Sequence, residues 1–196
     1  ILPANAPNAE YQLQVGLYRQ RDKERLTVLR WTRRSSDTLD LGAVTVKGRD
    51  RQFSPPTIAN RQQARIGSQI QFLGYNLEVS RSAGAYTLKL TLYWQALAAL
   101  DRSYTVFTHL LDKESRIWAQ QDGLPQGGVA PTTSWLVGEI LADEYVLPVN
   151  PNASPGDYLV EIGFYDGNTG QRLLVFDDQG RLQGDRILLE RKITLE

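Results

Sequence analysis

His109, the single histidine of this 196-residue chain, is the first residue with catalytic chemistry to offer. A Ser-His-Asp triad would use it as the base that activates a serine at an exposed turn. His109 instead lies inside the apolar run YTVFTHLLD (104–112), and the sequence has no G-x-S-x-G turn. We therefore expect a histidine that packs in a core or bonds between strands. With one histidine and no cysteine, the sequence predicts no zinc site.

Carboxylates gather around the irregular stretch 123–139, and paired carboxylates are what a glycosidase needs on either side of a cleft. Asp122, Glu139, Asp143 and Glu144 lie in or beside that stretch. Nothing in their spacing sets two of them facing each other. We expect them to be solvated or to cap turns, which makes a hydrolase the least favoured class of function.

The run Asp166–Gly170 (DGNTG) places oxygen-bearing side chains at alternate positions, as a calcium loop does. It has no bidentate glutamate further on, and its glycines suit a tight turn between two strands. We expect a hairpin turn here, with a calcium loop as the alternative. The sequence predicts neither a bound metal nor a cofactor.

Two tryptophans, Trp118 and Trp135, flank the stretch 123–139. An indole face binds the C–H face of a sugar ring, while neighbouring polar groups hold its hydroxyls. Trp118, Asp122 and Trp135 are therefore the candidate glycan-binding residues. The alternative is that both indoles pack this stretch onto the protein. Trp94 ends an apolar strand face and is expected in the core.

Period-two alternation of apolar and polar residues dominates the chain, and turn residues separate the alternating runs. The sequence predicts strands at 70–79 (with a bulge near Gly74), 86–94, 104–112, 140–149 (ended by Pro148) and 158–164. This pattern is typical of an all-β, antiparallel β-sandwich, Ig-like or jelly-roll-like. The residues expected to be buried are Trp94, Val106, Leu110, Val160, Ile162 and Phe164.

The chain also repeats itself. YQLQVGLYRQRDKERLTV (11–28) matches YLVEIGFYDGNTGQRLLV (158–175), and DTLDLGAVTV (37–46) matches DRILLERKITL (185–195). We interpret residues 1–50 as the last strands of a first β module, 51–65 as a linker and 66–196 as a complete module. The alternatives are generic hairpin similarity and early strands that belong to one larger sandwich.

Composition excludes several classes of function. The 22 basic and 22 acidic residues balance, so no electrostatic signature of nucleic-acid binding is present. No apolar run reaches the roughly eighteen residues that a membrane-spanning helix needs. Cysteine and methionine are absent, and because the chain begins at Ile1 we expect it to be a piece of a longer protein.

Five segments together resemble a known family: LYWQAL (92–97), YTVFTHLLD (104–112), WAQQDGLPQGG (118–128), PTTSWLVGE (131–139) and SPGDYLVEIGFYDGNTGQRLLV (154–175). They are similar to a domain at the C-terminus of bacterial integral-membrane glycosyltransferases. These enzymes depend on polyprenyl-phosphate sugars and are related to protein mannosyltransferases. The resemblance implies a non-catalytic, extracytoplasmic β-sandwich tethered to the membrane in the full-length protein.

Two functions follow from these observations. The first is a non-catalytic accessory module of a membrane glycosyltransferase, which packs against the enzyme or positions glycan. The alternative is a free-standing carbohydrate-binding module. The expected partners are glycan and the membrane-embedded portion of the parent protein, and no nucleic acid. For the N-terminal strands we expect association with the sandwich of the same chain, with a homodimer through them as the alternative.

Overall fold

The structure is a computed structural model that describes residues 6, 8–28 and 36–196. It divides into two compact units, Ile1–Asp50 and Arg51–Glu196, which are described one at a time. Parts of the expected first module, residues 1–5, 7 and 29–35, lie outside the described residues.

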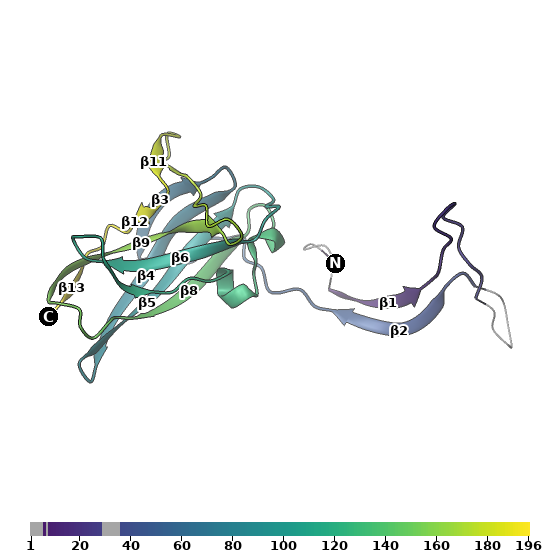
Figure 1. Ribbon diagram of the computed structural model, residues 1–196, viewed down its shortest axis with the longest axis horizontal. Coiled ribbons are helices and arrows are strands. Elements are labelled where there is room, and N and C mark those ends of the chain that lie inside the picture. Colours follow the sequence, from purple (N-terminus) through teal and green to yellow (C-terminus); the bar gives the residue numbers. More distant parts are fainter. Residues whose placement is uncertain (1–5, 7, 29–35) are drawn as a thin grey trace. The chain divides into compact units, whose positions relative to one another are not determined.

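The second unit consists of two antiparallel sheets packed face to face (Figure 1). One sheet has the strand order β11-β10-β3-β4-β5-β8, and the other has the order β12-β9-β6-β7, with β13 also paired to β9. The strands are β3 (Asn60–Ile66), β4 (Ile70–Ser82), β5 (Ala85–Ala96), β6 (Tyr104–Leu111), β7 (Ile117–Gln120), β8 (Ile140–Pro148), β9 (Gly156–Asp166), β10 (Val175–Phe176), β11 (Leu182–Gly184), β12 (Ile187–Leu188) and β13 (Ile193–Leu195). The predicted antiparallel β-sandwich is confirmed.

The core lies between these sheets and follows from the period-two pattern, because alternate side chains of a strand point to the same face. All six residues predicted to be buried are inaccessible to solvent. At its centre the ring of Trp94 lies 5.1 Å from that of Phe72 and 4.8 Å, edge-on, from that of Phe164. The Trp94–Phe164 contact joins the two sheets, because Trp94 lies in β5 and Phe164 in β9.

The predicted bulge in β4 is also confirmed. The pairing of β4 with β5 shifts register between Phe72 and Gly74. Gly74 has φ of +136°, and a Cβ at this position would lie 2.3 Å from the carbonyl oxygen of Asn60. Only glycine fits this conformation without strain.

The prediction that residues 51–65 form a linker is wrong for the second half of this range. Residues from Asn60 onward form β3, which pairs with β4 and β10. Its sequence, NRQQARI, has an apolar residue only at Ala64 and Ile66, so the alternation is too short to detect. Ahead of it Ile58 is buried, and Gln52 forms a bridge with Ile140. The sandwich therefore begins before residue 66.

Two 3-10 helices, η1 (Pro125–Gly128) and η2 (Thr132–Ser134), interrupt the irregular stretch 123–139. They are the helices of the described part of the chain, and none there is long and apolar enough to cross a membrane.

The first unit contains the antiparallel pair β1 (Ala9–Val15) and β2 (Leu39–Val46). Its pairing matches that around β9 position by position. The equivalent pairs are Tyr11↔Val44 and Tyr158↔Ile193, Val15↔Leu39 and Ile162↔Ile187, Tyr18↔Arg25 and Tyr165↔Arg172, and Val28↔Ser36 and Val175↔Gly184. The two sequence copies therefore share one scheme of strand pairing.

Candidate functional site

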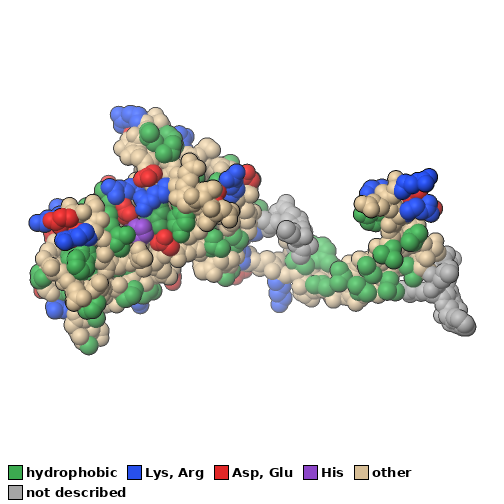
Figure 2. Space-filling view, viewed as in Figure 1, with side chains coloured by type: hydrophobic (Ala, Val, Ile, Leu, Met, Phe, Trp, Pro, Cys, Tyr) green, Lys and Arg blue, Asp and Glu red, His purple; other side chains and the backbone are tan. Residues whose placement is uncertain are grey.

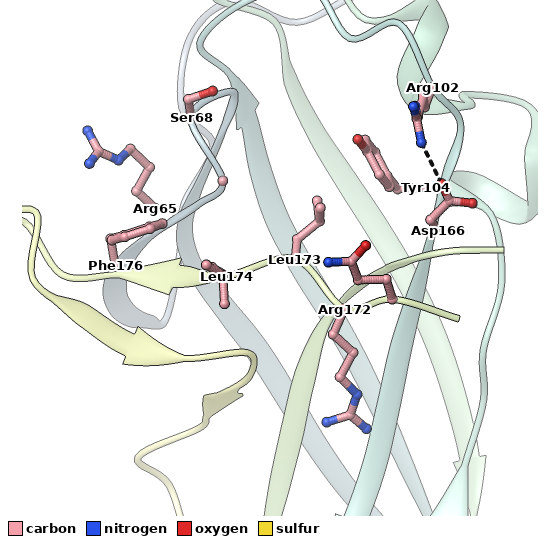
Figure 3. A pocket seen from close by; sticks show the side chains of 11 residues that line it. Arg65, Ser68, Arg102, Tyr104, Asp166, Arg172, Leu173, Leu174 and Phe176 are labelled. Atoms are coloured by element: carbon pink, nitrogen blue, oxygen red, sulfur yellow. Dashed lines mark hydrogen bonds and ion pairs between the residues drawn. The ribbon is translucent and has the colours of Figure 1, made fainter. Parts of the chain in front are cut away.

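A hollow of about 450 Å³ opens in the second unit where four segments meet (Figure 3). These segments are the β3–β4 turn, the start of β6, the chain from the end of β9 onward, and β10. The lining residues are Arg65, Gly67, Ser68, Arg102, Tyr104, Asp166, Gln171, Arg172, Leu173, Leu174 and Phe176. We call it the β6–β10 hollow.

One wall of the β6–β10 hollow is an ion pair. Arg102 donates to a carboxylate oxygen of Asp166 at 3.0 Å, and the backbone N–H of Asn168 donates to the other oxygen at 2.8 Å. Both hydrogen bonds lower the pKa of Asp166, and the one from the Asn168 backbone has the larger effect. The carboxylate is therefore ionised and held in one orientation. Most of the Arg102 side chain is exposed, which leaves its guanidinium open to a ligand.

The opposite wall is aromatic and apolar. The guanidinium carbon of Arg65 lies 5.6 Å from the ring centre of Phe176, within the range of a cation–π contact. Figure 3 shows this pair and the Arg102–Asp166 pair on opposite sides, with Leu173 and Leu174 between them. Tyr104 adds a half-buried ring next to Arg102. The hollow thus combines flat apolar faces with oriented polar groups.

Arg172 contributes its stem to the hollow but not its charge. Its guanidinium points away in Figure 3 and lies 4.1 Å from the ring centre of Phe107 and 3.5 Å from Glu161. Glu161 also contacts Arg186 at 2.7 Å. Cationic and acidic side chains gather on this face in Figure 2.

His109 completes this charged network. Its Nδ1 lies 2.8 Å from Glu161, on the neighbouring strand β9, and its Nε2 lies 3.3 Å from Asp122. Although burial favours a raised pKa for Glu161, the hydrogen bond with His109 and the arginine charges lower it to about 2. The side chain of His109 is 9% exposed. The predicted interstrand histidine is confirmed, and both ring nitrogens face carboxylates.

The three sequence-predicted site residues do not come together. Trp135 is 3% exposed and donates from Nε1 to the carbonyl of Ala130 at 2.8 Å, so its ring offers no face to a sugar. The prediction for Trp135 as a binding residue is therefore corrected: it packs the irregular stretch onto the core. Asp122 lies at His109, outside the β6–β10 hollow.

Trp118 is half-buried and lines a separate hollow of about 300 Å³. Its Nε1 donates to Asp112 at 2.7 Å, and the guanidinium of Arg116 lies 5.8 Å from its ring. The lining of this hollow includes neither Asp122 nor Trp135. Trp118 therefore retains a partly open ring, but without the neighbours that the sequence analysis assigned to it.

The carboxylates around 123–139 are used to hold that stretch in place. Asp143 is buried and accepts hydrogen bonds from the Gln126 backbone at 2.7 Å and from Tyr145 at 2.7 Å. Burial raises the pKa of Asp143. Glu139 pairs with Arg51 at 2.5 Å in the interior. These contacts explain the two buried carboxylates as structural anchors.

The Asp166–Gly170 run forms the predicted turn. The Asp166 carbonyl accepts from the Gly170 N–H at 2.7 Å, and Gly170 has φ of +71°. Across residues 6, 8–28 and 36–196, no group of three or more potential metal ligands lies together.

Sequence reasoning missed Arg65, Arg102, Tyr104, Gln171 and Phe176 as parts of one site. They come from three stretches that are far apart in the sequence: β3 gives Arg65, the start of β6 gives Arg102 and Tyr104, and the chain from the end of β9 to β10 gives Gln171 and Phe176. The DGNTG turn was the nearest signal, since its first residue, Asp166, forms one wall of the β6–β10 hollow.

No protein-family model matches the chain, and no curated protein matches it. Among solved structures, it is similar to the C-terminal domain of Wzt, at 13% identity and a TM-score of 0.46, over 71% of this chain and 85% of that one. It is also similar to a β-glucuronidase from Ruminococcus gnavus in complex with D-glucuronic acid, at 17% identity and a TM-score of 0.27, over 63% of this chain and 16% of that one. Both scores are too low for either likeness to assign a function. The resemblance to glycosyltransferase-appended domains stays a prediction.

Proposed function

We propose that this chain is a non-catalytic glycan-binding module, an extracytoplasmic accessory of a membrane glycosyltransferase, and that the β6–β10 hollow holds the glycan. The observation that carries the proposal is the arrangement of this hollow, with Phe176 on one side and, on the other, the ring of Tyr104 beside the fixed Arg102–Asp166 pair. A sugar needs both, because its ring has apolar C–H faces and a polar rim.

The dimensions of the hollow suit a small saccharide. Its volume of about 450 Å³ lies within the range of small-molecule sites. A sugar ring stacks on Tyr104 or Phe176, while Arg102 and Asp166 offer a donor and an acceptor to adjacent hydroxyls. Because Asp166 is already fixed by its own turn, binding orders few new side chains. This preorganisation favours affinity from a shallow site.

A role without catalysis fits the state of the acid–base groups. His109 faces a carboxylate at each ring nitrogen, which leaves it poorly placed to activate a serine. Glu139 and Asp143, the buried carboxylates near 123–139, are engaged in structural bonds. These observations support a binding module.

Glycan binding is tested by calorimetric titration of the full chain with neutral and charged oligosaccharides. We expect saturable binding whose affinity falls at least tenfold in Arg102→Ala and in Tyr104→Ala, which is a loss of roughly 1.4 kcal/mol or more of binding free energy. Arg116→Ala is the matched control, because Arg116 is an equally exposed arginine that is ion-paired with Asp112 outside the hollow. No saturable binding to any glycan, or equal loss in the control, overturns the proposal.

The assignment to a membrane glycosyltransferase is tested separately, by reading the complete gene that encodes this chain. Because the sequence resembles domains appended to such enzymes, we expect the gene to encode several apolar membrane-spanning segments. A gene without them removes the parent enzyme and the extracytoplasmic tether from the proposal. Glycan binding without such a gene supports the alternative, a free-standing carbohydrate-binding module.

A further inference from the structure

A further hollow, of about 270 Å³, lies in the first unit beside β1. Its lining residues are Gln14, Gly16, Leu17, Tyr18, Arg25 and Thr38. Their counterparts in the sequence repeat are Glu161, Gly163, Phe164, Tyr165, Arg172 and Arg186. The hollow can therefore be compared directly with the same place in the complete sandwich.

In the second unit this place is filled by Phe107 of β6. The ring lies directly on Gly163, since a Cβ there would be 2.5 Å from the Phe107 Cζ. Arg172 stacks on the ring at 4.1 Å, and Tyr165 flanks it with ring centres 6.5 Å apart. Glycine, arginine and tyrosine thus form a seat for an aromatic side chain.

The first unit retains the supports of that seat. Arg25 forms an ion pair with Asp37 at 2.9 Å, as Arg172 lies 3.9 Å from Asp185 in the second unit. A Cβ at Gly16 would lie 2.9 Å from the Asp37 carbonyl oxygen, and one at Gly163 lies 3.3 Å from that of Asp185. The equivalence is therefore one of side-chain contacts as well as strand pairing.

Apolar side chains in β1 and just after it are exposed, whereas the equivalent side chains in β9 are buried. Leu13, Val15 and Leu17 are 50%, 45% and 69% exposed. Their counterparts Val160, Ile162 and Phe164 are 0% exposed. Within the described part of the first unit, β1 pairs with β2, whereas β9 has β6 on its other side. An apolar strand edge of this kind readily accepts another strand.

We propose that β1 is a docking edge for an antiparallel strand of the β6 type, whose aromatic side chain occupies the seat over Gly16. The pairing of β6 with β9 sets the register: Phe107 lies opposite Gly163, Val106 opposite Phe164 and Leu110 opposite Val160. The incoming strand thus places its aromatic residue opposite Gly16 and apolar residues opposite Leu17 and Leu13. The occupant that we propose is the strand of the first module that corresponds to β6, since residues 11–28 and 37–46 repeat 158–175 and 185–195. This inference is independent of the glycan proposal.

The experiment fuses a copy of the β6 segment, residues 103–112, ahead of the full chain through a flexible Gly/Ser linker, which keeps the strand at high local concentration. Amide hydrogen exchange then reports on β1. We expect exchange at Gln12, Gln14 or Gly16 to slow at least tenfold relative to the unfused chain. Replacing the phenylalanine of the fused copy with alanine should reverse most of this protection, because the seat is then empty.

A matched control exchanges the valine and the phenylalanine at positions 106 and 107 of the fused copy, which turns the aromatic side chain to the opposite face of the strand. Equal protection by the phenylalanine, alanine and exchanged segments, or protection by none, overturns the proposal. Sedimentation of the unfused chain tests the other occupant, a second copy. A stable dimer whose β1 amides are already protected shows that β1 pairs with itself, and also overturns the proposal.

Discussion

Replacement of Glu161 by glutamine should remove a pH-dependent part of the stability of the second unit. Glu161 is buried, with 5% of its side chain exposed, and contacts His109, Arg172 and Arg186. Its pKa falls from 4.5 to about 2. Each unit of pKa corresponds to about 1.36 kcal/mol, so the ionised form contributes roughly 3 kcal/mol.

The sign follows from the direction of the shift. Because the pKa is lower in the folded than in the unfolded state, the contribution is fully present above about pH 5. It is lost as the pH falls toward 2, where the folded carboxylate takes up its proton. The excess of wild type over Glu161→Gln in unfolding free energy should therefore be roughly 2 kcal/mol larger at pH 7 than at pH 3, where the unfolded carboxyl is mostly protonated and the folded one is still mostly ionised.

Urea unfolding of both proteins between pH 7 and pH 3, followed by circular dichroism, measures this difference. Glu144→Gln serves as the control, because Glu144 is an exposed carboxylate on β8, and a surface change of this kind costs within about 0.5 kcal/mol. A gap between wild type and Glu161→Gln that is the same at every pH would refute the argument, since the ionic contacts would then contribute nothing to folding.

Three further predictions concern the fold. Gly74→Ala should lower the unfolding free energy by roughly 1–3 kcal/mol, because its φ of +136° disfavours a side chain; urea titration measures it. Trp135→Ala should cost roughly 3–5 kcal/mol in the same assay while sparing glycan binding, because the indole is buried away from the β6–β10 hollow. A chain without residues 1–50 should melt cooperatively near the temperature of the second unit in the full chain, whereas removal of residues 1–66, which includes β3, should abolish that transition in calorimetry.

Alternation was a sufficient guide wherever a strand is long and contributes several apolar residues to the core. Tyr158, Val160, Ile162 and Phe164 point inward at every second position, and the same holds for the apolar face of β5. The short strand β3 could not be predicted, because it contributes two small or medium apolar residues from a polar sequence. Its place in the sheet depends on pairing with β4 and β10, which is a tertiary effect.

The candidate site was less accessible to sequence reasoning. Trp135 beside a long irregular stretch suggests ligand binding, yet an indole N–H that finds a nearby carbonyl is equally suited to burial. Arg102 and Asp166 are far apart in sequence, and β6 and β9 bring them together by pairing Tyr104 with Asp166. A site built from such contacts leaves no local spacing to detect.

The two copies show that strand pairing and chemistry vary separately. Lys23, with φ of +60°, takes the place of Gly170, and the turn keeps its hydrogen bond to the carbonyl of the residue four positions earlier. At that earlier position Arg19 replaces Asp166, and it pairs with Asp22 at 2.8 Å within its own turn. The acceptor that we assign to the glycan is therefore absent from the described residues of the first copy's turn. Because the aromatic seat at Gly16 is retained while this acceptor is replaced, the first unit keeps the features that we assign to strand assembly, and the second unit has in addition those that we assign to glycan binding.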